Sequence, residues 1–384
     1  MFGIKLFRQL QRFDWILFFS LLTLFAFGIS AIYSVELSRD ATNFGLLQKH
    51  LVAFGIGMIL LFVAANANYV LLRSYGRLLY IVGLILMVAV LFFGRELNGT
   101  TGWFIVAGVS FQPVEFMKIA LAVQLARYFG EHARRRFGWR ELLGSGFLVL
   151  LPVLLTMMQP DLGSALLLVG MWGILLFFAG ITWVQGAVIG LSGVIVAISA
   201  WFLVFADYQK QRVLVFLNPD LDPLGDGYNI TQAKIAIGSG QIFGRGLGFG
   251  SQSQLKFLPE SQTDFIFSVI GEELGFLGIA VLLLAAGILL WRILTLVMQS
   301  RDSFTGFLAT AIFALIFVQM SVNIGVNLGI LPATGVGLPF VSYGGSSLLA
   351  YLFLIGVVQS IAVRIHPEDR QSTAWYTRAG TGNV

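Results

Sequence analysis

The fold of this chain is decided by the stretch DFIFSVIGEELGFLGIAVLLLAAGILLWRILTLV, residues 264–297. It is predominantly apolar over more than the ~20 residues with which an α-helix crosses the ~30 Å hydrocarbon core of a bilayer. In lipid, backbone N–H and C=O groups must bond within their own segment, which favours a helix. We therefore predict a transmembrane helix here.

Apolar runs of similar length recur along the whole chain, which is 57% hydrophobic and only 11% charged. Soluble domains average about 25% charged residues, so this composition excludes a soluble protein. The other predicted spans are 14–34, 46–66, 78–94, 112–130, 142–157, 160–179, 184–205, 304–327 and 346–364. We therefore predict an all-α polytopic membrane protein with about ten helices. One membrane domain covers residues 1–370, and residues 371–384 form a disordered cytoplasmic tail.

Lys and Arg determine the predicted orientation. An even number of spans places both termini on one side, and the short loops and tails of that side carry twelve basic residues against three on the other. Basic residues gather in cytoplasmic loops, so we predict that both termini are cytoplasmic. The net charge of +5 follows from this topology and does not indicate nucleic-acid binding. With no cysteine and three separated histidines, the chain offers no disulfide, catalytic thiol or His-based metal site.

The segment 206–263 is predicted to be a large extracytoplasmic loop between the seventh and eighth helices. Its apolar stretches argue against disorder, so we expect an ordered loop with a short helix near 228–238. Eight glycines between residues 225 and 250 end in GRGLGFG (244–250). Glycines let backbone N–H groups approach a phosphate. A glycine-rich surface turn explains the same residues.

Charged side chains within spans are costly and are therefore candidates for function. Asp264 lies at the boundary between the long loop and the eighth span, where a carboxylate can stay ionised beside a substrate whose tail is in lipid. Glu115 and Lys118 lie three residues apart, on one face of the fourth span, as either a structural ion pair or a substrate-facing pair. Asp161 begins the sixth span, where a carboxylate also suits the helix macrodipole.

Further polar groups lie in the C-terminal third of the chain. Glu272 and Glu273 lie deeper in the eighth span. One face of the ninth span carries an amide stripe, Gln319, Asn323 and Asn327. Hydrogen bonding between helices is the simplest interpretation of both sets. The segment LPATGVGLPFVSYGGSS (331–347) combines prolines with small residues and predicts a broken or re-entrant connection.

The outer ends of the fourth, sixth and eighth spans thus each carry an acid, and the long loop supplies basic residues. This combination suits an anionic, lipid-linked substrate at the boundary between lipid and water. One carboxylate could act as a general base while cations hold a leaving pyrophosphate. On the residues alone, an enzyme and a transporter remain equally open.

Five ordered motifs resemble those of the SEDS family, the shape, elongation, division and sporulation proteins. They are QPVEFMK (112–118), QPDLGSALLL (159–168), YNITQAKIAIGSG (228–240), LPESQTDFIFSVIGEELG (258–275) and LPFVSYGGSS (338–347). The resemblance covers roughly residues 14–365. The segments DYQKQRV (207–213), DPLGDGY (222–228) and SQSQLKFLPE (251–260) resemble the elongation branch of the family more than its division branch.

The resemblance implies a ten-helix peptidoglycan glycosyltransferase of the bacterial cytoplasmic membrane that polymerises lipid II, an undecaprenyl-linked disaccharide pentapeptide. It implies that Asp264 is the general base, that Glu115 and Lys118 are a functional pair, and that Asp161 is a further catalytic acid. The implied substrate or pyrophosphate contacts are Gln112, Arg212, Lys234 and Lys256.

The resemblance also implies a partner, a class B penicillin-binding protein that crosslinks the glycan. No metal ligand set is visible in the sequence, and a requirement for Mg²⁺ or Mn²⁺ stays open because pyrophosphate often needs a divalent cation. Two alternatives to the transferase remain: a flippase that carries lipid II across the bilayer, and a scaffold that activates the penicillin-binding protein.

Overall fold

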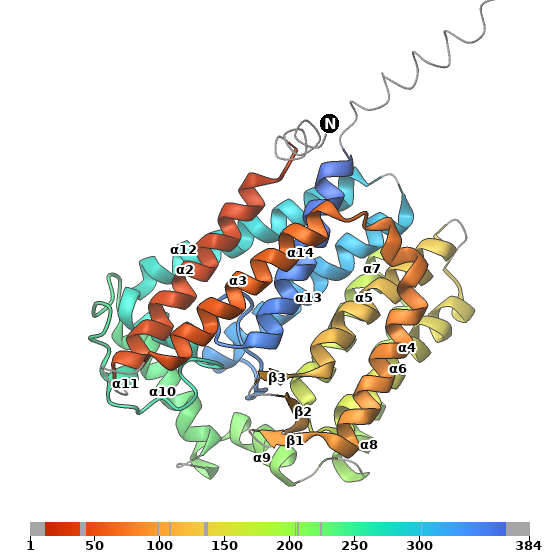
Figure 1. The fold of residues 1–384 in the computed structure, drawn as a ribbon. Coiled ribbons are helices and arrows are strands. Elements are labelled where there is room, and N and C mark those ends of the chain that lie inside the picture. Colours follow the sequence, from red (N-terminus) through yellow and green to blue (C-terminus); the bar gives the residue numbers. More distant parts are fainter. Residues whose placement is uncertain are drawn as a thin grey trace, which may run out of the picture.

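The computed structural model describes residues 12–38, 44–97, 100–106, 109–133, 137–203, 205, 207–222, 225–300 and 302–365. Ten long helices form one bundle (Figure 1). They are α2 (Trp15–Leu37), α3 (Gly45–Asn66), α4 (Val70–Phe93), α5 (Pro113–His132), α6 (Trp139–Met158), α7 (Leu162–Ala179), α8 (Trp183–Leu203), α12 (Ile266–Gln299), α13 (Ser303–Asn327) and α14 (Gly345–Ile365). The predicted tail, 371–384, lies outside the described residues.

These helices confirm the predicted spans, and the chain is a polytopic membrane protein. Nine of them have the length and apolar composition of a membrane span. The exception is α5, because it carries Glu115, Lys118, Arg127 and Glu131 within its 20 residues. The largest difference in bounds is at α4, which begins at Val70 and not at the predicted residue 78.

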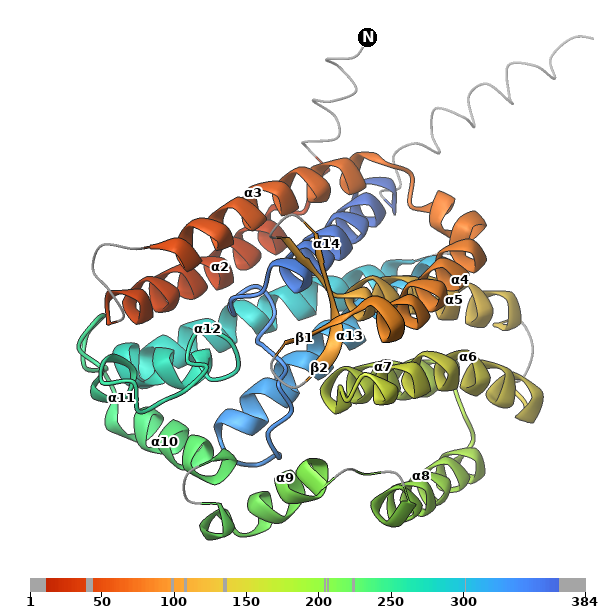
Figure 2. The same ribbon diagram turned by 60° about the horizontal axis from the view of Figure 1, so that its bottom comes forward.

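Successive long helices run in opposite directions, so the bundle has two distinct ends. The start of α2 and the end of α14 lie at the same end (Figure 1), as an even number of spans requires. The opposite end holds a small sheet and the elements of the segment 206–263 (Figure 2). The helices α5, α7 and α12 all begin at this second end.

The centre of the bundle contains α13 and α14, whose apolar stretches are the most buried of the nine apolar spans. The most extensive contact between two helices is that of α14 with α3. A Cβ added at Gly356 would lie 2.5 Å from the Leu61 carbonyl oxygen, and one at Gly57 would lie 2.2 Å from a Leu352 methyl carbon. Small residues at helix contacts let backbones approach closely, which is how helices associate where lipid removes the hydrophobic driving force.

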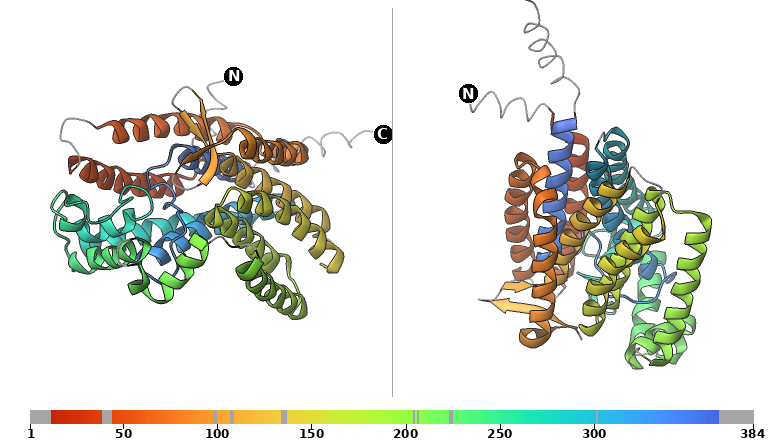
Figure 3. Two further views of the ribbon diagram at one scale, coloured as in Figure 1. Left: turned by 90° about the horizontal axis from the view of Figure 1, so that it is seen from below. Right: turned by 90° about the vertical axis from the view of Figure 1, so that its right-hand side faces the viewer.

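One span stands apart from the others. Figure 3 shows α8 beside the bundle, and of its residues, all of which are described, only Gln185 is buried. The Gln185 side chain accepts a hydrogen bond from the Thr182 N–H (2.9 Å) and donates one to the Phe137 carbonyl (3.2 Å). A helix that is apolar on every face and unburied by protein is one that lipid surrounds.

The described residues of the segment 206–263 form short helices and turns, as predicted for an ordered loop. It contains α9 (Asp207–Leu217), the 3₁₀ helix η1 (Pro219–Leu221), α10 (Asp226–Ser239) and α11 (Ser251–Gln254). The helix expected near 228–238 is α10, whereas α9 was not predicted. Also unpredicted is the antiparallel sheet of β1 (Arg95–Leu97), β2 (Thr100–Val106) and β3 (Val109–Phe111), which joins α4 to α5.

The long helix α12 is broken at Gly275, whose backbone angles (φ 66°, ψ −163°) only glycine adopts readily. The break frees backbone groups that bond to the glycine-rich run. The Glu272 and Glu273 carbonyls accept the N–H groups of Arg245 (3.0 Å) and Gly246 (2.9 Å). In return, the N–H groups of Phe276 and Leu277 donate to the carbonyls of residues 241 and 242, at 2.8 and 3.1 Å.

This exchange corrects the interpretation of the glycine-rich run. Two of the N–H groups considered for phosphate binding, those of Arg245 and Gly246, bond to α12, and the glycines permit the contact. A Cβ at Gly240 would lie 1.9 Å from the Gly271 carbonyl oxygen, and one at Gly244 would lie 2.2 Å from the Glu273 carbonyl oxygen. The run therefore packs against a broken helix and is not merely a surface turn.

The two deeper glutamates are structural, in different ways. Glu273 accepts hydrogen bonds from Ser34 of α2 and from Ser253 (3.3 Å), which confirms bonding between helices. Glu272 instead accepts from the N–H groups of Gln252 (2.8 Å) and Ser253 (3.1 Å) at the start of α11. A carboxylate at that position satisfies N–H groups that have no partner within the helix.

Candidate active site

The predicted catalytic residues and Gln112 lie where α5, α7 and α12 begin. Gln112 and Asp161 are the residues directly before α5 and α7, and Asp264 lies two residues before α12. Glu115 and Lys118 lie on the first two turns of α5. Because α5, α7 and α12 begin at the same end of the bundle, residues that are far apart in the sequence lie at that end.

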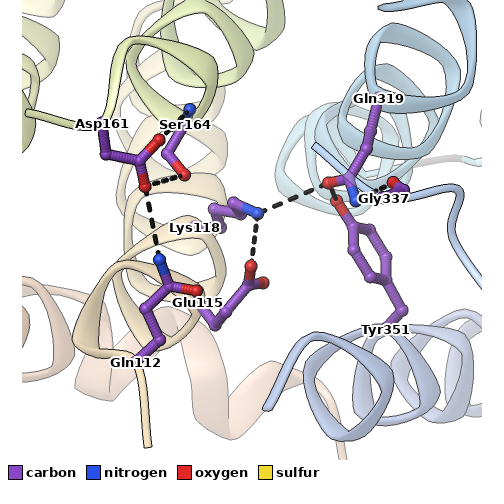
Figure 4. Close-up of polar contacts among 8 residues, drawn as sticks. All are labelled: Gln112, Glu115, Lys118, Asp161, Ser164, Gln319, Gly337 and Tyr351. Atoms are coloured by element: carbon purple, nitrogen blue, oxygen red, sulfur yellow. Dashed lines mark hydrogen bonds and ion pairs between the residues drawn. The ribbon is translucent and has the colours of Figure 1, made fainter. Parts of the chain in front are cut away.

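Asp161 caps α7. Its carboxylate accepts hydrogen bonds from the Ser164 N–H (2.8 Å) and hydroxyl (2.7 Å). The structural interpretation of Asp161 is therefore confirmed. The same carboxylate also accepts the Gln112 amide at 3.3 Å, which joins the starts of α7 and α5 (Figure 4).

Glu115 and Lys118 form a buried ion pair, with Lys118 Nζ 2.7 Å from Glu115 Oε1 and side chains 8% and 3% exposed. Lys118 Nζ also donates to Gln319 Oε1 at 3.4 Å and lies 5.8 Å from the ring centre of Tyr351. The Tyr351 hydroxyl donates to the same Gln319 oxygen (Figure 4). The amide of Gln319 in turn donates to the Gly337 carbonyl at 2.9 Å.

The other carboxylate oxygen of Glu115, Oε2, is buried and has no hydrogen-bond partner among the described residues. A buried charged oxygen without a donor is costly. The ion pair with Lys118 is thus what holds this carboxylate in place.

Asp264 lies in a turn and is partly buried. Its N–H donates to the Glu260 carbonyl at 3.2 Å, and α12 begins only at Ile266, so Asp264 precedes the helix and does not open it. A Cβ added at Gly335, which has φ 69°, would lie 4.0 Å from Asp264 Oδ2. The carboxylate therefore faces the irregular segment between α13 and α14, residues 328–344.

The predicted basic contacts lie at the edge of this cluster. Lys234 is exposed on α10, and a Cβ added at Gly329 would lie 2.5 Å from its Nζ. Lys256 is exposed two residues after α11, and Arg212 is partly buried on α9, which packs on α10. The structure thus brings Lys234 to the irregular segment and leaves Arg212 and Lys256 on the surrounding loop elements.

Two residues of the cluster escaped the prediction. Tyr351 lies in an apolar span with no nearby charge in sequence, so nothing in the sequence marked it. Ser164 belongs to the motif QPDLGSA but gave no signal of its own. Among the described residues, no group of three or more Asp, Glu or His side chains could hold a metal ion.

The cell cycle protein family that groups FtsW, RodA and SpoVE matches residues 14–366. The chain belongs to the SEDS family. The peptidoglycan glycosyltransferase MrdB of Escherichia coli K12 is 39% identical over 330 residues, covering 84% of this chain and 87% of that protein. The stage V sporulation protein E of Bacillus subtilis is 37% identical over 364 residues, covering 91% and 96%.

Solved structures of SEDS proteins have the same fold. The rod shape determining protein RodA of Thermus thermophilus is 29% identical, covers 91% of this chain and 96% of its own, and has a TM-score of 0.68. A chain from a study of polymerization and crosslinking by a peptidoglycan synthase complex is 31% identical, covers 92% and 98%, and has a TM-score of 0.77.

Proposed function

We propose that this chain polymerises lipid II into glycan strands with Asp264 as the general base. The chain is a peptidoglycan glycosyltransferase, because it belongs to the SEDS family and its 39% identical relative has that activity in its name. The likeness to a rod shape determining protein supports a role in cell elongation. The observation that carries the proposed mechanism is the Asp264 carboxylate, which faces the irregular segment at the bundle end where α5, α7 and α12 begin.

In the proposed reaction, the 4-hydroxyl of an acceptor N-acetylglucosamine attacks C1 of a donor N-acetylmuramic acid. The new O–C1 bond forms as the bond from C1 to undecaprenyl pyrophosphate breaks, so the configuration inverts from α to β. Asp264 accepts the hydroxyl proton, and the leaving pyrophosphate takes the bonding electron pair. General-base catalysis of this kind contributes about 10²–10⁴-fold to the rate.

The remaining site residues receive roles that suit their surroundings. Lys118 offsets part of the charge that develops on the pyrophosphate, and Glu115 holds Lys118 in place through their ion pair. Asp161 and Gln112 fix the start of α7 against α5 and offer polar contacts to the sugar. The loop bases Arg212, Lys234 and Lys256 attract the anionic substrate.

A divalent cation, Mg²⁺ or Mn²⁺, would bind to the pyrophosphate of the substrate and not to a site formed by protein side chains alone. The described residues hold no cluster of three acids or histidines. Mg²⁺ is often bound by substrate phosphates together with one or two carboxylates. We propose that any such cation arrives with the pyrophosphate.

We also propose a topology and a partner. Both termini are cytoplasmic and the site faces the extracytoplasmic side, which is supported by the start of α2 and the end of α14 lying opposite the starts of α5, α7 and α12 (Figure 1). The partner is a class B penicillin-binding protein that crosslinks the product. The similar chain from a peptidoglycan synthase complex supports this choice.

The deciding experiment measures glycan polymerisation from lipid II by the purified protein together with its penicillin-binding partner. Asp264→Asn keeps the shape of the side chain and removes the base, so product should be lost. Asp220→Asn is the matched control, since it neutralises an exposed acid in η1 of the same loop. Product from Asp264→Asn would move the base to Glu115 or Asp161. No product from folded wild type bound to its partner, with lipid II crossing a vesicle membrane, would establish transport instead.

A further inference from the structure

Three consecutive backbone carbonyls, ending at Asp264, are held by hydrogen bonds from other parts of the fold. The Gln262 carbonyl accepts the Tyr343 N–H at 2.9 Å, and the Thr263 carbonyl accepts the Ser342 hydroxyl at 2.6 Å. Both donors belong to the irregular segment 328–344. The turn that carries the proposed base is therefore attached to that segment at successive residues.

The third carbonyl, that of Asp264 itself, accepts two side-chain amides of the stripe on α13. Asn323 Nδ2 donates to it at 2.9 Å and Asn327 Nδ2 at 2.8 Å. Both asparagines are buried and both are engaged elsewhere as well. Asn323 also donates to the Val336 carbonyl at 2.8 Å, and Asn327 Oδ1 accepts the Ser268 hydroxyl at 2.7 Å. Neither side chain can therefore turn away from Asp264 without breaking a second bond.

The same stripe also reaches the other half of the site. Gln319, one turn before Asn323, accepts a hydrogen bond from the Lys118 ammonium and donates one to the Gly337 carbonyl. Successive members of the stripe lie ~6 Å apart along the helix axis. The helix α13 thus contacts both the proposed base and the buried lysine. It also contacts the irregular segment, where Gln319 donates to the Gly337 carbonyl and Asn323 to the Val336 carbonyl.

We propose that the amide stripe, Gln319, Asn323 and Asn327, is a positioning element that sets the Asp264 carboxylate at a fixed distance from Lys118. Amides suit this task because they are uncharged and hold the backbone without adding charge beside the base. The stripe joins helices, as expected from the sequence, and four of its hydrogen bonds go to Lys118, Tyr351 and the Asp264 carbonyl. This inference rests on the proposed role of Asp264 as base.

Loss of the hydrogen bonds to the carbonyls of residues 262–264 should displace the Asp264 carboxylate. Asp264 lies outside α12, in a turn where its N–H donates to the Glu260 carbonyl, and the bonds from Asn323, Asn327, Ser342 and Tyr343 attach that turn to the rest of the fold. A displacement of about 1 Å between reacting groups can lower a rate by ~10²-fold. A positioning role therefore predicts loss of kcat in protein that is still folded, with substrate binding retained.

The test compares three variants of the full chain, assayed with its penicillin-binding partner and lipid II. Asn323→Leu removes two donors at nearly constant shape. Ser342→Ala removes the bond to the Thr263 carbonyl and the bond that its hydroxyl accepts from the Leu338 N–H at 2.7 Å, and it is the milder change because both amides on the Asp264 carbonyl stay in place. Thr310→Val is the matched control, because Thr310 is buried on the same helix and, among the described residues, its hydroxyl bonds only to Gly306 of α13.

We expect kcat per folded molecule to fall by about 10- to 100-fold in Asn323→Leu and less in Ser342→Ala, with KM within about twofold of wild type. Thr310→Val should keep the wild-type kcat. A second measurement reports the turn directly: the chain has no cysteine, so a spin label on Glu260→Cys is the only one attached. Its mobility should rise in Asn323→Leu and stay unchanged in Thr310→Val.

The outcomes separate this inference from the proposed function. If Asp264→Asn is inactive while Asn323→Leu and Ser342→Ala keep the wild-type kcat, the positioning role is wrong and the base stands. If the variants lose only folded yield, the stripe is purely structural. If Asn323→Leu does not fold, Ser342→Ala and its label spectrum decide. If Asp264→Asn is active, the proposed base is wrong, and the positioning role is overturned with it.

Discussion

The buried pair of Glu115 and Lys118 yields a prediction that separates stability from activity. Lys118→Met removes the one hydrogen-bond donor that the Glu115 carboxylate has among the described residues, since Oε2 has none. It also takes the ammonium away from the Gln319 amide oxygen. Breaking a buried ion pair from one side typically costs about 3–5 kcal/mol, because the remaining charge is left uncompensated. We expect Glu115→Gln to be destabilised on the same scale.

The double variant, Lys118→Met with Glu115→Gln, should behave differently. Replacing both partners leaves no buried charge, and such replacements are often neutral or stabilising. We therefore expect the double variant to unfold close to the wild-type midpoint in detergent, followed by tryptophan fluorescence. It should still make no glycan from lipid II, because the charges that we assign to the reaction are gone.

A matched control lies on the same helix. Arg127 and Glu131 form an ion pair at 2.9 Å with side chains 20% and 39% exposed. Exposed helical pairs contribute only about 0.3–0.5 kcal/mol, so Arg127→Met should shift the midpoint little and leave polymerisation intact. Recovery of both stability and glycan synthesis in the double variant would refute the functional assignment. A stable Lys118→Met single variant would refute the reasoning about buried charge.

Three further predictions concern the contact between the long loop and α12. Gly240→Ala should lower the free energy of unfolding by about 1–3 kcal/mol, because the added methyl group overpacks against Gly271. Gly238→Ala has open space around its added Cβ and should be neutral or stabilising in the same thermal scan. Gly275→Ala should cost about 1–3 kcal/mol, since its backbone angles are strained for alanine; an unchanged midpoint would show that the break adjusts. Glu272→Gln should speed amide hydrogen exchange at the start of α11, because a charged acceptor for two N–H groups is lost, and unchanged exchange there would contradict the cap.

The ten spans could be predicted because bilayer thickness imposes a length and an apolar composition that the sequence displays openly. Even α5 was predicted, although it carries four charged residues, because most of its other residues are apolar. The break at Gly275 gave no comparable signal, because a glycine inside an apolar span is common in membrane helices. The strands between α4 and α5 are short, and short segments carry little periodicity to detect.

The residues of the candidate site could be predicted from the sequence, but the hydrogen bonds that connect them could not. Motif resemblance pointed to Asp264, Glu115, Lys118 and Asp161 one by one. Their partners come from segments far away in the chain: Asn323 and Asn327 reach Asp264 across 59 and 63 positions, and Gln319 reaches Lys118 across 201. Contacts at such separations depend on helix packing, which local sequence does not encode.

The break in α12 also has a consequence for how the protein is made. Ribosomes release the chain from its N-terminus, so the glycine-rich run leaves the ribosome before the helix that it completes. When α12 enters the bilayer, the carbonyls of Glu272 and Glu273 and the N–H groups of Phe276 and Leu277 find their partners already synthesised. Until they meet, four polar groups lie beside lipid at a cost of several kcal/mol each. Completion of α12 thus depends on the docking of a segment that is made before it, and a chain in which the run does not dock leaves these four groups without their partners.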